Sequence, residues 1–132
     1  MKKLGFCILI LESFLMTACD RTVPVEIKNE TKDTITIKAI ANYCYDNSNS
    51  LVDYKESYND DNTMNIHFRL PPKVTVTCGM AIMGIEKDLP FDKLKVYMKN
   101  DSIIANTRKE VLNLFEKRRS GNYTIPYQIV IK

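Results

Sequence analysis

The chain has 132 residues, with 19 Lys and Arg against 16 Asp and Glu and a formal net charge of +3. This near-balance argues against a dedicated nucleic-acid binder, and the length allows one domain with a sizeable core. Because His67 is the single histidine and no nucleophile lies beside a recognisable base, the sequence does not support acyl-transfer machinery.

The N-terminal segment indicates export. Lysines at positions 2 and 3 precede an apolar run over residues 4–15, and Met-Thr-Ala then stands directly before Cys19. This pattern resembles a bacterial lipoprotein signal peptide, in which small residues precede the cut and the cysteine thiol is acylated. The alternative, an uncleaved membrane helix, needs roughly 20 apolar residues, more than this run provides. The resemblance implies a signal peptide at 1–18, a lipidated tether at 19–22, and anchoring through acylated Cys19 in the outer membrane of a Gram-negative cell envelope.

The same cleavage determines which cysteines remain in the exported domain. Cleavage before Cys19 would remove Cys7 and leave Cys44 and Cys78 as the two thiols of an exported domain. An even pair in an oxidising compartment favours a disulfide between Cys44 and Cys78. The alternative is two unpaired thiols buried as small hydrophobic side chains.

The exported part begins with two predicted strands. Residues 23–28 alternate between apolar and polar side chains, and so do residues 34–39. The polar residues 29–33 between them predict a hairpin loop, so these two strands are expected to pair. Pro24 lacks an amide hydrogen, which predicts an edge position for the first strand.

Residues 42–63 are rich in Asn, Asp and Ser without a sustained period, which predicts a long loop. Four of the seven tyrosines lie here: Tyr43, Tyr45, Tyr54 and Tyr58. Tyrosines among small polar residues suit recognition of a protein or a glycan, because a flat apolar ring carries a polar tip at low entropic cost. The alternative is that these rings fold back over an open end of the domain.

Alternating side chains predict three further strands, over residues 64–70, 74–82 and 93–99. His67 lies on the polar face of the first of them and is expected to point to solvent. Cys78 lies on the apolar face of the second and is expected to point inward together with Met80 and Ile82.

A helix is predicted near the end of the chain. After a short segment at residues 102–105, Thr107 and Glu110 form a capping-box pattern, and the apolar residues that follow lie on one helical face. Gly121 is expected to follow the helix as its C′ residue, before a final strand at residues 123–131.

About seven short strands, one late helix and no alternation of strands with helices predict a mainly β fold. The expected architecture is an antiparallel two-sheet sandwich, immunoglobulin-like in strand order, over residues 23–132.

No metal, cofactor or catalytic centre is predicted. The cysteines and His67 lack the close spacing of zinc ligands. The oxygen-rich residues 46–50 lack the glycine and the terminal glutamate of a calcium loop. Asp60 and Asp61 are adjacent, and they are expected to be solvated loop charges rather than a glycosidase pair.

The layout of the exported domain is similar to that of small lipoproteins of unknown function common in gut anaerobes. The likeness lies in an early strand region, a tyrosine-containing loop, and a late helix before a final strand. It implies a membrane anchor and a sandwich fold, and it transfers no catalytic residue. We expect a non-enzymatic interaction or accessory module that meets an envelope protein or glycan. The alternative is an inhibitor or immunity-type lipoprotein that blocks a hydrolase or toxin.

Overall fold

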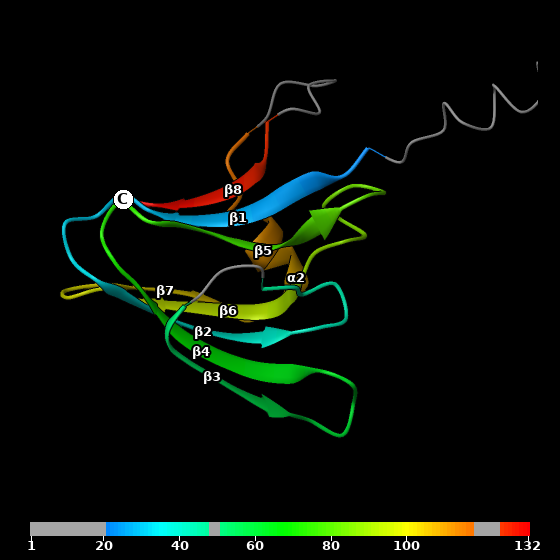
Figure 1. Ribbon diagram of the computed structural model, residues 1–132, viewed down its shortest axis with the longest axis horizontal. Coiled ribbons are helices and arrows are strands. Elements are labelled where there is room, and N and C mark those ends of the chain that lie inside the picture. Colours follow the sequence, from blue (N-terminus) through cyan, green and yellow to red (C-terminus); the bar gives the residue numbers. More distant parts are fainter. Residues whose placement is uncertain (1–20, 48–50, 118–124) are drawn as a thin grey trace, which may run out of the picture.

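The computed structural model describes residues 21–47, 51–117 and 125–132. Its elements are β1 (Val23–Asn29), β2 (Ile35–Ala41), β3 (Val52–Tyr58), β4 (Met64–Leu70), β5 (Thr75–Ala81), β6 (Phe91–Tyr97), β7 (Ser102–Ala105), α2 (Arg108–Leu112) and β8 (Tyr127–Ile131). Within these residues the strands form two sheets packed face to face, with the orders β5-β1-β8 and β3-β4-β2-β6-β7 (Figure 1). The predicted mainly β sandwich with one late helix is confirmed.

The core lies between the sheets and consists of the alternate side chains that both sheets direct inward. β1 and β2 alternate strictly between buried and less buried positions, as expected for strands with one face on a core. The largest fully buried side chains are Phe68, Phe91, Ile27, Ile35, Ile37, Leu70, Leu89, Leu94, Ile129, Ile131, Val25 and Val76. Because these apolar groups take the inner faces, the outer faces carry most of the polar side chains.

The first two strands lie in different sheets, so the predicted hairpin between them is wrong. β1 pairs with β5 and β8, whereas β2 pairs with β4 and β6. The connection crosses from one sheet to the other and is held by buried Asn29. The Asn29 side-chain nitrogen donates to the carbonyls of Leu70 in β4 and of Asp33, both at 2.9 Å. A polar linker predicts a turn, but it does not say which sheet the next strand joins.

β1 is the central strand of the smaller sheet, so the predicted edge position is also wrong. Pro24 lies opposite Met80 of β5, and the pairing with β8 begins only at Val25. Pro24 therefore lies before the β1–β8 pairing begins, and its missing amide hydrogen costs no bond to β8. A central strand can accommodate proline at such a position near its start.

β5 contains a bulge that changes which of its side chains face the core. Cys78 has no partner in β1, as the extra residue of a bulge. Gly79 follows, and a Cβ there would lie 2.5 Å from the Cys44 carbonyl oxygen. Cys78 points inward as predicted, but Met80 and Ile82 are exposed. The extra residue shifts the alternation by one position, so the expectation for these two side chains is wrong.

Residues 42–63 are not one long loop, because they include β3. This strand pairs antiparallel with β4 at the edge of the larger sheet. Most of its side chains are exposed, so it lacks the aliphatic alternation by which a half-buried strand is recognised. Asp53 has a φ of 55°, at the register shift between Val52 and Lys55.

α2 begins as predicted and ends much earlier. The Thr107 hydroxyl accepts from the Glu110 amide at 3.2 Å, and the Glu110 carboxylate accepts from the Thr107 amide at 3.2 Å, which confirms the capping box. Phe115 then forms a bridge with Ile129 of β8. Since this bridge takes the chain into the smaller sheet, the helix does not reach Gly121, which lies outside the described residues.

Candidate functional site

The outer face of the larger sheet carries a row of cationic side chains on adjacent strands. The register places Lys55 of β3 beside His67 of β4. It also places Lys38 of β2 between His67 and Lys95 of β6. Because adjacent strands are about 4.8 Å apart, this row crosses four strands over roughly 15 Å.

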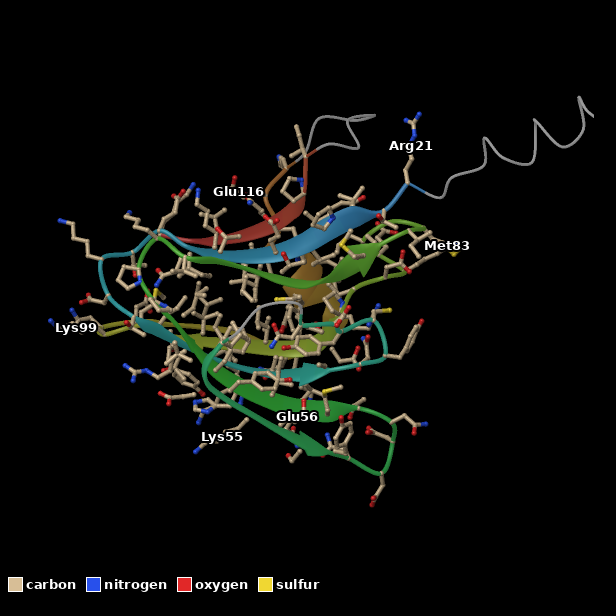
Figure 2. The ribbon with its side chains drawn as sticks, in the orientation of Figure 1. Arg21, Lys55, Glu56, Met83, Lys99 and Glu116 are labelled. Atoms are coloured by element: carbon tan, nitrogen blue, oxygen red, sulfur yellow. The ribbon has the colours of Figure 1, made fainter. Side chains whose placement is uncertain are left out.

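The row lies in an open hollow of about 590 Å³, which we call the basic hollow. Its lining residues are Lys38, Ala39, Ile40, Lys55, Glu56, Ser57, Asn65, Ile66, His67, Lys93, Lys95, Tyr97 and Asn106. Figure 2 labels Lys55 and Glu56, which project from opposite sides of β3 at the border of the hollow.

The charges in the basic hollow are unbalanced. Among the described residues none of its lysines forms an ion pair. The one acidic residue of the lining, Glu56, lies opposite Ile66 on the other side of β3, where its carboxylate accepts hydrogen bonds from the Tyr54 and Tyr58 hydroxyls at 2.9 and 3.3 Å. Like charges directly opposite on neighbouring strands are destabilising. The Lys38–Lys95 pair therefore opposes folding slightly and leaves a positive potential that a bound anion would neutralise.

An aromatic ring and neutral polar groups lie next to these cations. The Lys38 ammonium is 5.6 Å from the centroid of the Tyr97 ring, within the range of a cation–π interaction. The Tyr97 ring is also partly exposed to solvent. Ser57, Asn65 and Asn106 add hydroxyl and amide groups that donate and accept hydrogen bonds. The face can thus pair anionic groups, hydrogen-bond hydroxyls and stack on a flat apolar surface.

The sequence predicted the direction of His67 but not the site around it. His67 lies on the outer face, half-buried among the lining residues. The lysines of the hollow come from three separate strands, and each one alone looks like an ordinary solvated charge. One signal was present, because the polar faces of the strands at 34–39, 64–70 and 93–99 contain Lys, Arg and His but no acidic residue.

The four tyrosines of residues 42–63 separate into two pairs. Tyr45 and Tyr54 pack against the core, and the centroids of the Tyr45 and Phe91 rings are 5.9 Å apart. Burial raises the pKa of Tyr45 above its usual range, and a hydrogen bond with Tyr54 adds to the shift. Tyr43 and Tyr58 are 89% and 75% exposed. Two rings therefore contribute to packing, and the other two stay predicted recognition residues.

Cys44 and Cys78 are free thiols in this structure, which differs from the predicted disulfide. The chain segments that carry them are neighbours, since the Asp46 amide donates to the Cys78 carbonyl at 3.0 Å. Cys78, however, belongs to the core cluster, whereas Cys44 is half-buried. Cys78 thus packs as a small hydrophobic side chain, and burial raises the pKa of its thiol.

Alkylation of the folded protein is expected to modify Cys44 at least about a hundredfold faster than Cys78, because the attacking species is an accessible thiolate. Peptide mapping after iodoacetamide treatment, with and without urea, measures this ratio. The two thiols should react alike in urea. Equal rates in the folded protein would contradict the buried position of Cys78, and a lack of reaction at both sites until a reductant is added would restore the disulfide.

The remaining sequence candidates lie apart from the basic hollow. Among the described residues no cluster of His, Cys, Asp and Glu could hold a metal ion. Asp61 accepts hydrogen bonds from the hydroxyl and the amide of Thr63, which lower the pKa of its carboxyl. Asp60 and Asp61 therefore belong to the β3–β4 turn.

Residues 48–50 and Cys19 lie outside the described residues. Among the residues that the structure describes, no helix is long and apolar enough to cross a membrane.

No protein-family model matches this chain, and no curated protein or solved structure matches it either. Its function is therefore inferred from the basic hollow and from the N-terminal sequence.

Proposed function

We propose that this chain is a lipid-anchored protein of the cell envelope whose sandwich domain binds an anionic ligand in the basic hollow without changing it chemically. The observation that carries the proposal is the row of Lys55, His67, Lys38 and Lys95, whose lysines form no ion pair within the described residues. An arrangement of like charges that costs stability suggests a compensating role in binding.

The anchor is supported by the sequence. The basic residues, the apolar run and the small residues before Cys19 form a lipoprotein-type signal. Acyl chains on Cys19 would hold the domain at a membrane. A single acyl chain gives only marginal binding, so stable anchoring would require more than one. The outer membrane of a Gram-negative cell remains the location that we propose.

The lining of the hollow favours binding over catalysis. A nucleophile needs a base within hydrogen-bond reach, and the register places Ser57 opposite Asn65 rather than opposite His67. His67 itself lies between Lys55 and Lys38.

An acidic glycan is the ligand class that suits the lining best. Carboxylates on a sugar chain would pair with the lysines, hydroxyls would bond to Asn65 and Asn106, and a sugar face would stack on Tyr97. A nucleic acid is less suitable, because proteins that bind single strands stack successive bases on several aromatic rings, and Tyr97 is the one Phe, Tyr or Trp side chain in the lining.

Calorimetric titration of the purified full chain with polygalacturonate fragments tests the binding proposal. We expect affinity at least about tenfold higher than for uncharged dextran fragments, and a loss of affinity as salt rises from 0.05 to about 0.5 M, since salt screens exposed charges. Equal affinity for the charged and uncharged sugars would contradict the proposal, as would tighter binding of single-stranded RNA.

The anchor has its own test, which is the intact mass of the protein extracted from membranes. The wild-type chain should lack residues 1–18 and carry the added mass of acyl groups, whereas Cys19→Ala protein should be unprocessed and should not carry them. Equal processing of the two chains would remove the basis for the anchor.

The alternative function, inhibition of a hydrolase or toxin, is favoured by one observation. Tyr43 and Tyr58 are exposed aromatic rings, the kind of side chain that dominates protein interfaces. This function predicts one tight protein partner whose binding is lost in Tyr58→Ala and unchanged by charge reversal in the basic hollow.

A further inference from the structure

We infer that the end of the sandwich formed by Ile82, Met83 and Tyr43 rests in the interface of a lipid bilayer, beside the point where the chain is anchored. This inference rests on the proposed acylation of Cys19, and it adds how the domain is oriented. We call these three residues the apolar tip.

The first argument is the short distance between the apolar tip and the anchor. Val23, the first residue of β1, lies opposite Ala81, the last residue of β5, so their Cα atoms are about 5 Å apart. Ile82 and Met83 follow Ala81 directly. Three residues lie between Cys19 and Val23 along the chain, so the four Cα–Cα steps that join them span at most about 14 Å. An acylated Cys19 therefore holds the apolar tip close to the headgroups.

Figure 2 shows the same relation in space. Arg21 and Met83 lie at one end of the molecule, and Lys99, in the β6–β7 turn, lies at the opposite end. A chain anchored just before Arg21 presents the end with Met83 to the membrane.

The second argument is the chemistry of the apolar tip. Ile82 is 55% and Met83 is 69% exposed, and Tyr43 is more exposed than either. Single exposed apolar residues are common, but Ile82 and Met83 lie next to each other in one loop. Tyr43 belongs to the same end, because the preceding residue, Asn42, donates from its amide to the Pro90 carbonyl at 3.0 Å and from its side chain to the Leu89 carbonyl at 2.9 Å, where that loop ends. Tyrosine is enriched at membrane interfaces, where its ring is buried and its hydroxyl is hydrated.

The third argument is that four amides of the loop form hydrogen bonds within the loop. Asp88 accepts from the amides of Ile82 and Met83 at 2.7 and 2.6 Å. The Gly84 carbonyl accepts from the amides of Lys87 and Asp88 at 3.1 and 3.0 Å. Unpaired amides make it costly for a loop to leave water, so this pairing allows the apolar tip to approach lipid. Glu86 and Lys87 are exposed in the same loop and can stay among the headgroups.

Fluorescence quenching in vesicles tests this orientation directly. The chain contains no tryptophan, so Met83→Trp introduces a single probe at the apolar tip, and Lys99→Trp places a matched probe at the opposite end. Each lipidated full-length variant is reconstituted into phosphatidylcholine vesicles with and without brominated acyl chains. We expect Met83→Trp to lose at least about half of its fluorescence in brominated vesicles and Lys99→Trp to lose less than about a tenth, because bromine quenches only at short range.

The outcomes separate the inference from the anchor on which it rests. Intact mass first shows whether each variant is acylated, and a chain without acyl groups contradicts both proposals. An acylated Met83→Trp chain that is not quenched, or is quenched no more than Lys99→Trp, overturns the orientation and leaves the anchor standing. A blue-shifted but unquenched probe would show that another copy of the chain covers the apolar tip. Ile82→Trp repeats the test if Met83→Trp disturbs the fold, which circular dichroism reports.

Discussion

Asn29→Ala is expected to lower the free energy of unfolding by about 2 to 4 kcal/mol, because it removes one buried and three partly buried hydrogen bonds at once. Besides its two donated bonds, the Asn29 side-chain oxygen accepts from the Thr31 amide and hydroxyl at 2.9 and 2.7 Å. The bond to Leu70 also links β1 of the smaller sheet to β4 of the larger one. Alanine would leave the buried Leu70 carbonyl without this donor, so the loss exceeds that of one exposed hydrogen bond.

Urea denaturation followed by circular dichroism measures the effect. Asn100→Ala is the matched control, because Asn100 is exposed in the β6–β7 turn and its loss should change stability by less than about 0.5 kcal/mol. A cost below about 1 kcal/mol for Asn29→Ala would show that other contacts hold the crossover between the sheets.

Lys95→Glu is expected to act in opposite directions on binding and on stability. It should weaken the binding of an acidic glycan by about one to two orders of magnitude. Reversing one charge a few ångströms from a bound anion changes the affinity by roughly this factor. It should also raise the free energy of unfolding by about 0.2 to 1 kcal/mol, since a carboxylate would then lie opposite Lys38. A substitution that merely damaged the fold would lower both quantities.

Calorimetric titration and urea denaturation of one preparation measure the two effects together. Lys99→Glu makes the same change of charge outside the lining of the basic hollow, and should alter affinity by less than about threefold because salt screens distant charges. If the two variants bind equally well, the anion is bound elsewhere. If Lys95→Glu is less stable than the wild type, the Lys38–Lys95 pair is not a source of strain.

The alternation of side chains predicts strands well where one face is aliphatic, as over residues 64–70 and 93–99. It fails for β3, because that strand has little core beneath it and its side chains are mostly exposed. It also fails beyond Cys78, where one extra residue reverses the faces of Met80 and Ile82. Such bulges depend on a contact across the fold, here between Gly79 and the Cys44 carbonyl, which no local pattern reports.

The basic hollow is harder to predict than the strands that form it. Each lysine lies on a polar face, as the sequence indicates, but the row exists only because β2 lies between β4 and β6. That order depends on the crossover at Asn29, since a hairpin of the first two strands would separate Lys38 from its present neighbours. The lining of the site is therefore a consequence of strand order, and strand order depends on contacts distant in sequence.

The parallel pairing of β1 with β8 determines when this domain can finish folding. Val25 lies opposite Tyr127, and Asn29 lies opposite Ile131, so β1 can pair with β5 first, but the smaller sheet is complete only after the distant β8 has paired. Closing so long a segment is entropically costly, and folds rich in such contacts form slowly.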